Sequence, residues 1–190
     1  PKINSESISR ITEGIGQILA KSGYQMLLTI TNNNSSKELE YVDLFEAYPV
    51  DGIILVGTVL TRAHKKKLKE CKVPIVVIGQ YTKETSCVYH DDYGAAKALA
   101  EQVGREASGR VAYIGVTRED KAAGAAREDG FREGLKEVGK ELEESCLRRA
   151  KFTMESGYEQ AVDLLEKEHD IDIISCATDT IAAGAIEAIA

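Results

Sequence analysis

The sequence predicts an α/β protein built from two similar subdomains, each with a parallel sheet. Short aliphatic runs alternate with longer helical segments along the whole chain. The runs near 53–56 and 75–78 are continuously apolar, which is typical of strands buried on both faces of a parallel sheet. Helices between successive strands favour right-handed βαβ crossovers. Because the alternation restarts after residue 93, we predict an N-terminal subdomain at 1–93 and a C-terminal subdomain at 94–190.

The N-terminal subdomain begins with a predicted helix from about Glu6 to Ser22, with Ser5 as N-cap and Gly23 as the residue that ends it. Apolar positions at helical spacing predict one buried face, made of Ile8, Ile11, Ile15, Ile18 and Leu19. The other predicted elements are a strand at 24–30, a turn-rich segment at 31–36, helices at 37–48 and 62–71, and strands at 51–57, 74–78 and 87–89.

The C-terminal subdomain repeats the pattern. Its predicted elements are helices at 92–106, 122–138 and 155–167, strands at 110–116, 146–150 and 171–176, and a last helix capped by Thr178 or Asp179. The chain opens on Pro1–Ser5 directly before a helix and ends on a helix with no strand after it. We therefore expect the first strand of the N-terminal subdomain to be missing and the C-terminal subdomain to be incomplete at its end.

Composition narrows the class of protein. The 190 residues are 43% hydrophobic, which is enough for a sizeable core, and carry a net charge of −7. The only basic block, His64–Lys67, is predicted on a solvated helix face, so we expect no nucleic-acid-binding surface in this chain. Four widely spaced cysteines predict a cytoplasmic protein with inert, mostly buried thiols. No apolar run reaches membrane-spanning length and no signal peptide opens the chain, so we expect no membrane partner.

Polar residues gather where the predicted strands end, the edge at which open α/β sheets bind ligands. These strand-end residues are Lys2, Asn4, Ser5, Asn32–Asn34, Gly57, Thr58, Gln80, Thr117, Arg118, Asp120, Thr178, Asp179 and Thr180. Amides, hydroxyls and carboxylates of this kind satisfy sugar hydroxyls, which both donate and accept hydrogen bonds. A catalytic site would need a nucleophile with its base or two carboxylates in contrasting environments, and the sequence singles out neither.

Other kinds of site are disfavoured. The three adjacent residues His90–Asp92 cannot all reach one metal ion, so we predict a strand end and helix cap there and no metal site. His64 and His169 lie beside charged residues on helical ends and are predicted to be solvated. Cys176 lies on a predicted buried strand, which favours a core thiol over a nucleophile. No dinucleotide fingerprint or P-loop is present, and we predict no cofactor.

The order of these segments resembles the effector-binding domain of the lactose-repressor family of transcriptional regulators. The resembling segments are Pro1–Ser5, Ala20–Tyr24, Val50–Leu55, Val73–Ile78, Asp91–Ala96, Arg110–Gly115, Arg127–Phe131, Ser156–Ala161 and Ala177–Ala185. The resemblance implies two Rossmann-like subdomains in the periplasmic-binding-protein-like type I arrangement, with a ligand crevice between them. It also implies a homodimer that binds operator DNA through a helix-turn-helix headpiece absent from this chain. Helices at 8–15 and 62–68 are candidates for the dimer surface, although core packing explains their apolar residues equally well.

The strand-end residues, together with Arg127 from a segment that resembles the family, predict where a ligand binds. The predicted ligand-binding residues are Lys2, Asn4, Ser5, Gly57, Asp120, Arg127, Thr178, Asp179 and Thr180. Arg127 is the expected main anchor, since a planar guanidinium can bridge sugar hydroxyls or hold a phosphate. The alternative is an ordinary surface arginine paired with Asp129 or Glu133.

The sequence departs from the family in three places that bear on the ligand. Lys2 and Thr178 both stand where the family usually has asparagine, and Ser7-Ile8 replaces the aromatic pair that often follows the first motif. Lys2 and the segment 176–180 are most similar to trehalose-operon repressors, which implies a sugar phosphate such as trehalose 6-phosphate. A Lys2 cation facing the crevice would suit a phosphate, whereas an exposed lysine near a terminus explains Lys2 equally well.

Two classes of function therefore stay open. The first is the sensing domain of a cytoplasmic, sugar-responsive regulator. The second is a periplasmic-type sugar-binding protein that serves transport or chemotaxis, and an enzyme is a distant third.

Overall fold

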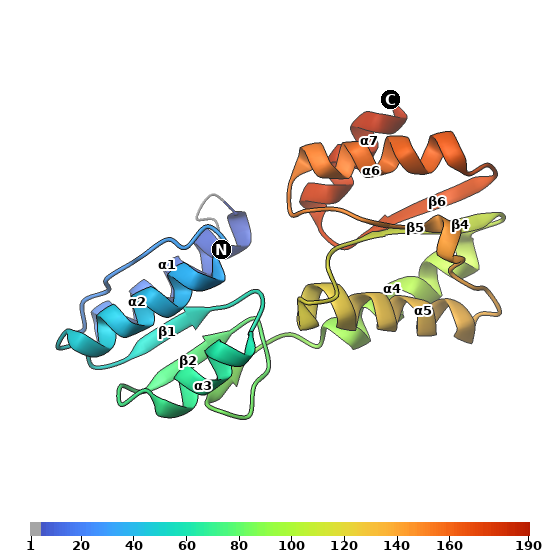
Figure 1. Cartoon of the computed structure of the whole chain (residues 1–190). Coiled ribbons are helices and arrows are strands. Elements are labelled where there is room, and N and C mark those ends of the chain that lie inside the picture. Colours follow the sequence, from blue (N-terminus) through green and yellow to red (C-terminus); the bar gives the residue numbers. More distant parts are fainter. Residues whose placement is uncertain (1–4) are drawn as a thin grey trace. The chain divides into compact units, whose positions relative to one another are not determined.

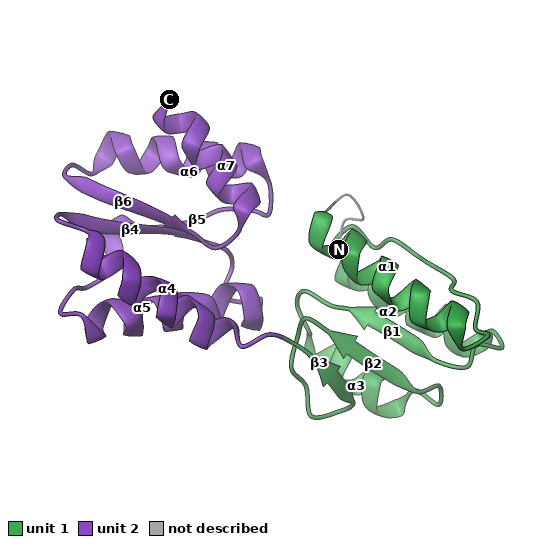
Figure 2. Ribbon diagram, turned by 180° about the vertical axis from the view of Figure 1, so that it is seen from behind, with its two compact units in different colours: residues 1–89 green, residues 90–190 purple. Residues whose placement is uncertain are grey.

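The structure, a computed structural model, describes residues 5–190 and divides into two compact units, residues 1–89 and 90–190 (Figures 1 and 2). Each unit has its own hydrophobic core and its own three-stranded parallel sheet. Helices connect successive strands within each unit, as the alternating pattern predicted, except at residues 79–85, where a loop joins two strands. The prediction of an α/β protein with parallel sheets is therefore confirmed.

Unit 1 is built on a sheet of order β1 (Ile53–Val56), β2 (Ile75–Ile78) and β3 (Ser86–Val88). Its helices are α1 (Glu6–Lys21), α2 (Ser35–Ala47) and α3 (Arg62–Glu70). Alternate residues of β1 and β2 point into one small core, composed of Val42, Ile53, Leu55, Leu68, Ile75 and Val77. Leu68 of α3 belongs to this core, so it is not available for a dimer surface.

Local sequence explains where the helices of unit 1 begin. Asn34 caps α2, because its side chain accepts hydrogen bonds from the backbone of Ser36 and Lys37. Thr61 caps α3 in the same way. Lys67 of α3 forms ion pairs with Asp43 and Glu46 of α2 at 2.5 and 2.6 Å. These two helices therefore lie on one face of the sheet, and α1 lies on the other (Figures 1 and 2).

The predicted strand at 24–30 was wrong, because this segment pairs with no neighbour among the described residues. Its side chains are largely exposed, with Leu27 at 68% and Leu28 at 52%. A strand exists only where a ladder of hydrogen bonds satisfies its backbone, and composition alone does not supply a partner. The prediction for α1 holds for its length but not for its burial. No residue of this helix is buried and Ile18 is 63% exposed.

His64 was predicted to be solvated, and this was wrong. The imidazole is fully buried between α2 and α3. Its Nε2 lies 3.1 Å from Oε2 of Glu38, which is 1% exposed, and its Nδ1 lies 2.8 Å from Oγ1 of Thr61. Thr31 donates to the other carboxylate oxygen of Glu38. The ring is therefore a hydrogen-bonded core residue whose partner lies 26 positions away in the sequence.

Unit 2 has β4 (Arg110–Gly115) at the centre of its sheet, between β5 (Leu147–Arg149) and β6 (Ile171–Cys176). The helices α4 (Asp92–Glu106) and α5 (Arg127–Glu137) cover one face (Figures 1 and 2). The other face is covered by α6 (Met154–Lys167) and α7 (Asp179–Ile189). A short 3-10 turn, Glu144–Cys146, leads into β5. The larger of the two cores lies here, around Phe131, Leu135, Ile114, Leu164 and Ile181.

The helix predicted at 122–138 starts differently from the prediction. Lys121–Ala126 forms a π-helical segment, and regular α5 begins at Arg127. The carboxylate of Asp120 accepts hydrogen bonds from the backbone of Ala122 and Ala123 and fixes the start of this segment. Gly124 packs so closely on the carbonyl of Thr117 that a Cβ there would overlap it. A wider helical turn next to a strand-end loop is common at functional sites.

The cysteines are free, as predicted, but they are not mostly buried. Cys146 is buried, whereas Cys71, Cys87 and Cys176 are half-buried. Each of these three lies at the margin of a unit's core rather than inside it.

Candidate functional site

In each unit the parallel strands bring their carboxyl ends to one edge of the sheet. Unit 1 presents Gly57, Gly79–Tyr81 and Tyr89 after its strands, and unit 2 presents Val116–Asp120, Ala150–Thr153 and Ala177–Thr178. Ligands of open α/β sheets bind at this edge, so these loops define the candidate site of each unit.

Arg127 is the best-anchored predicted residue. Its Nε donates to Oδ1 of Asp92 at 2.7 Å and its Nη1 to the carbonyl of Ala177 at 2.5 Å. One guanidinium thus joins the first turns of α5 and α4 to the end of β6. Asp92 is only 8% exposed, whereas 33% of the Arg127 side chain remains open to solvent. Its Nη2 has no hydrogen bond among the described residues, so the group keeps donors for a ligand.

The predicted residues at the start of α7 directly follow Ala177, whose carbonyl accepts a hydrogen bond from Arg127. Thr178 follows Ala177 and caps α7, with its Oγ1 accepting from the backbone of Ile181 at 3.3 Å. Asp179 and Thr180 are exposed in the first turn of the helix. The structure therefore brings Arg127 and the turn at 177–178 together in unit 2.

The remaining predicted residues have mixed outcomes. Asp120 is 3% exposed and its carboxylate caps the π-helical segment, so the residue positions the loop. Gly57 is buried in unit 1, and its backbone N–H donates to Ile78. Ser5 is exposed and makes no side-chain capping bond to α1. Lys2 and Asn4 lie outside the described residues. A ligand role for each of these residues stays a prediction.

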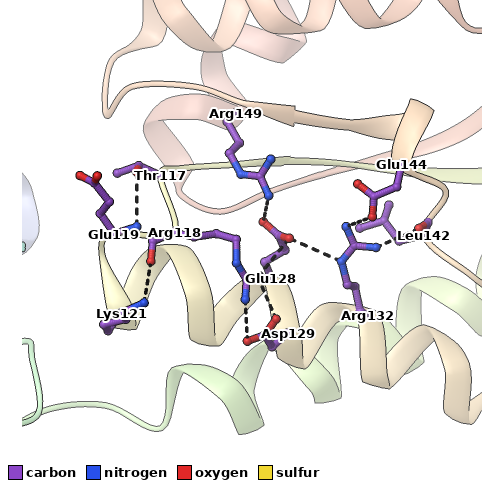
Figure 3. Close-up of polar contacts among 10 residues, drawn as sticks. All are labelled: Thr117, Arg118, Glu119, Lys121, Glu128, Asp129, Arg132, Leu142, Glu144 and Arg149. Carbon is purple, nitrogen blue, oxygen red and sulfur yellow. Dashed lines mark hydrogen bonds and ion pairs between the residues drawn. The ribbon is translucent and has the colours of Figure 1, made fainter.

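A cluster of charged residues around Glu128 was not predicted from the sequence (Figure 3). Glu128 of α5 is 3% exposed and faces three arginines. Arg149 lies 2.8 Å from its carboxylate, Arg118 3.1 Å and Arg132 3.5 Å. Only the Glu128–Arg132 pair has a helical i,i+4 spacing that the sequence could show. The other two partners come from the loop after β4 and from the end of β5.

Aromatic residues at the strand ends were also missed. The rings of Tyr81 and Tyr89 follow β2 and β3 and contact each other edge to face, with centroids 5.5 Å apart. They are 60% and 53% exposed, so the core does not explain them. In unit 2 the half-buried Phe152 lies in the loop after β5. Aromatic rings at such positions can pack against the apolar face of a sugar.

Beneath the edge of unit 2, Tyr113 of β4 stacks on Phe131 with ring centroids 4.7 Å apart. Its hydroxyl is buried, and it has no hydrogen-bond partner among the described residues. Burial raises the pKa of this phenol above its usual range. The hydroxyl is therefore neutral and unsatisfied, and it lies close enough to Arg127 at the start of α5 to interact with its charge.

Chemistry other than binding finds little support at these edges. Burial raises the pKa of the Cys176 thiol to about 11, which keeps it protonated and unreactive. Asp91 accepts from the backbone of Gly94 at 2.9 Å as the cap of α4, the role predicted for this segment. Within residues 5–190 the structure contains no group of His, Cys, Asp and Glu side chains placed to hold a metal ion.

Comparison with known proteins decides the family. Residues 7–190 match the family described as periplasmic binding proteins and sugar binding domain of LacI family. This chain belongs to that family. The LacI-family resemblance drawn from the sequence, and the periplasmic-binding-protein-like fold that it implied, are confirmed.

The relatives of this LacI-family chain are transcriptional regulators. The sucrose operon repressor of Staphylococcus xylosus is 28% identical over 182 residues, which cover 96% of this chain and 56% of the repressor. The crystal structure of the transcription regulator CcpA of Lactococcus lactis is 27% identical, with a TM-score of 0.88 over 100% of this chain and 69% of that one. The trehalose repressor from Escherichia coli covers 99% of this chain and 71% of its own with a TM-score of 0.83, but at 20% identity it shows the fold alone.

The LacI-family chain thus spans a little over half the length of the sucrose operon repressor. In the part of the chain that the structure describes, no helix is both long enough and apolar enough to cross a membrane.

Proposed function

We propose that this chain is the ligand-sensing domain of a sugar-responsive bacterial transcriptional regulator. The main observation in support of this proposal is the environment of Arg127. Arg127 is held by a buried carboxylate and a strand-end carbonyl while a third of its side chain faces solvent. Such a guanidinium is oriented before a ligand arrives, so little conformational entropy is lost on binding. Membership of a sugar-binding family supports a carbohydrate as the ligand.

Ligand contacts are proposed at the strand-end edge of each unit. In unit 2 these would come from Arg127, Asp179, Thr180 and the face of Phe152. In unit 1, Gly57 would allow the backbone to approach the ligand, and the exposed Tyr81–Tyr89 pair would cover an apolar sugar face. Lys2, Asn4 and Ser5 remain proposed contacts of the same ligand.

Calorimetric titration of the 190-residue chain with a panel of neutral mono- and disaccharides and their 6-phosphates tests the proposal. A sugar that binds wild type and fails to bind Arg127→Ala supports it. Binding of every active sugar with equal affinity to both proteins would refute the assignment of Arg127. Trehalose 6-phosphate belongs in this panel because the sequence resembles trehalose-operon repressors around Lys2 and 176–180.

Regulation is proposed for the longer protein. Ligand binding would change operator affinity through a helix-turn-helix domain outside this chain, in the cytoplasm, and without any catalytic step. Gel-shift titration of the full-length gene product with and without the sugar distinguishes an inducer from a co-repressor. A full-length protein that is exported and ignores DNA would favour the alternative, a periplasmic-type binding protein for transport or chemotaxis.

A homodimer is also proposed, since regulators that read two half-sites are commonly two-fold symmetric. On unit 2 the exposed apolar side chains of α6 and α7 offer a surface for the second copy. These side chains are Met154, Tyr158, Leu165, Ile186 and Ile189. A hollow of about 370 Å³ lies among Met154, Tyr158 and three glutamates of the same helices. Sedimentation of the full-length protein as a monomer at micromolar concentration would contradict the dimer.

A further inference from the structure

We propose that Arg149 and Arg118, oriented by the buried carboxylate of Glu128, form a subsite in unit 2 for a phosphate group. The inference rests on the proposed function, because the phosphate is taken to be part of a phosphorylated sugar effector.

The position of the two arginines fits a ligand subsite. Arg149 is the last residue of β5 and pairs in register with Gly115, the last residue of β4. Arg118 follows three residues after Gly115. Both side chains therefore start from the carboxyl edge of the sheet, the same edge as Arg127. Figure 3 shows them reaching Glu128 from two sides, Arg149 from the strand and Arg118 from the loop.

Glu128 fixes the guanidinium groups from below. Its carboxylate is 3% exposed and accepts from Nη2 of Arg149 at 2.8 Å. Nη1 of Arg118 lies 3.1 Å away. A buried carboxylate that shares its charge among several guanidinium groups holds each of them in one orientation and neutralises none of them fully.

Arg149 has the most unused capacity in this cluster. Arg118 also makes two hydrogen bonds to Asp129, and Arg132 is bound by Glu144 and the carbonyl of Leu142. Arg149 shares Glu128 and has no second acidic partner among the described residues. Its side chain is 43% exposed, and its Nε and Nη1 make no described hydrogen bond.

These free donors have the chemistry of a phosphate site. A guanidinium offers parallel N–H groups that match two phosphate oxygens, which a single lysine ammonium cannot do. Arg118 would add charge from the neighbouring loop. Arg132 is fully engaged and serves the structure of α5, so we assign it no contact with the anion.

The test measures binding of inorganic phosphate to the 190-residue chain by calorimetry, with chloride used to keep the ionic strength constant. We expect phosphate to bind wild type and Arg149→Gln to bind at least about tenfold more weakly, the loss of one charge-assisted contact. Arg105→Gln is the matched control, because Arg105 is an exposed arginine of α4 paired with Glu101 at 3.0 Å. It should bind phosphate as wild type does.

Arg149→Lys guards against a folding defect, since it keeps the charge and loses the planar fork. We expect its phosphate affinity to fall between those of wild type and Arg149→Gln. Equal phosphate affinity in wild type, Arg149→Gln and Arg149→Lys would overturn the subsite. So would an equal loss in Arg149→Gln and Arg105→Gln, because it would show non-specific attraction of the anion.

Sugar titrations separate this inference from the proposed function. If neutral sugars bind, and the affinities for inorganic phosphate and for sugar phosphates are the same in wild type and Arg149→Gln, the subsite is rejected and the sugar sensor is retained. Phosphate binding that depends on Arg149, with no sugar or sugar phosphate bound more tightly than inorganic phosphate, would keep an anion site and reject the sugar sensor.

Discussion

At the scale of single residues, Arg127 joins two roles that are usually separate. The sequence-based expectation was an arginine that anchors the ligand. The structure shows that it also neutralises Asp92, which is 8% exposed. Truncation of the arginine therefore leaves a buried carboxylate without its cation.

We expect Arg127→Ala to weaken effector binding by roughly 2–4 kcal/mol and also to destabilise the domain by about 1–3 kcal/mol. Asp92→Asn in the same background should restore part of the stability and none of the affinity, because it removes the stranded charge only. Urea denaturation and calorimetry of the two single variants and the double variant complete the cycle. Additive stability effects would show that the pair contributes no coupling.

Substitution of Tyr113 should change stability in the opposite direction to substitution of Arg127. Its hydroxyl is buried without a hydrogen-bond partner among the described residues, so its removal relieves a desolvation cost. Tyr113→Phe should leave thermal stability unchanged or raise it by up to about 1–2 kcal/mol. Tyr48→Phe, at a tyrosine that is 60% exposed, should leave thermal stability unchanged. A clear loss of stability in Tyr113→Phe would mean that the hydroxyl is satisfied in solution.

At the scale of elements, the π-helical segment before α5 depends on one close approach. A Cβ at Gly124 would overlap the carbonyl of Thr117, which is backbone and cannot move aside. Gly124→Ala should therefore cost about 1–3 kcal/mol or more. Gly14→Ala is the matched control on α1, since nothing lies within 4 Å of a Cβ there. That substitution should stabilise by about 0.5–1 kcal/mol, and chemical denaturation measures both.

The elements also show what sequence patterns can predict. Aliphatic runs located β1, β2, β4 and β6, since these strands supply apolar side chains to the core of their unit. The same reasoning failed at 24–30, because periodicity reports burial preference and not the presence of a pairing partner. It failed at His64 for a related reason: the acceptor that makes burial possible, Glu38, is on another helix.

The candidate site was predictable only where one short segment contains its geometry. Thr178 as a helix cap follows from the local order of strand, turn and helix. The partners of Arg127 lie 35 and 50 residues away, and two partners of Glu128, Arg118 and Arg149, lie in other segments of the chain. Spacing cannot reveal such contacts, because they depend on how the strands order themselves in the sheet.

At the scale of the whole molecule, ion pairs at the ends of unit 2 make its stability depend on pH. Hydrogen bonds from Arg110 lower the pKa of Glu168 below 4.5, and Lys167 and Arg148 lower that of Asp163 below 3.8. Backbone N–H groups of Gly109 and Ser108 do the same for Asp172. A lowered folded-state pKa contributes stability above the ordinary value, and this contribution disappears as pH falls through the folded-state value.

We therefore expect the contribution of these carboxylates to the free energy of unfolding to be constant near neutral pH. It should fall progressively below about pH 4.5. Glu168→Gln should flatten the acidic limb, because it removes one of the groups that must be protonated. Denaturant titrations at a series of pH values from neutral to acidic measure both curves. An acidic limb of equal slope in the two proteins would count against the Arg110–Glu168 pair as a source of the pH dependence.

The unpaired segment 24–30 also affects how readily the isolated chain aggregates in solution. These seven residues, Tyr-Gln-Met-Leu-Leu-Thr-Ile, contain no charge and no proline, and most of their side chains are exposed. An unpaired extended backbone with such a sequence is a template for intermolecular cross-β stacking. Concentrated samples should scatter light increasingly with time, and Leu27→Lys should delay the onset by placing a gatekeeper charge at the centre of the segment. The shelf life of the protein would then be limited by seven residues with which no described strand pairs.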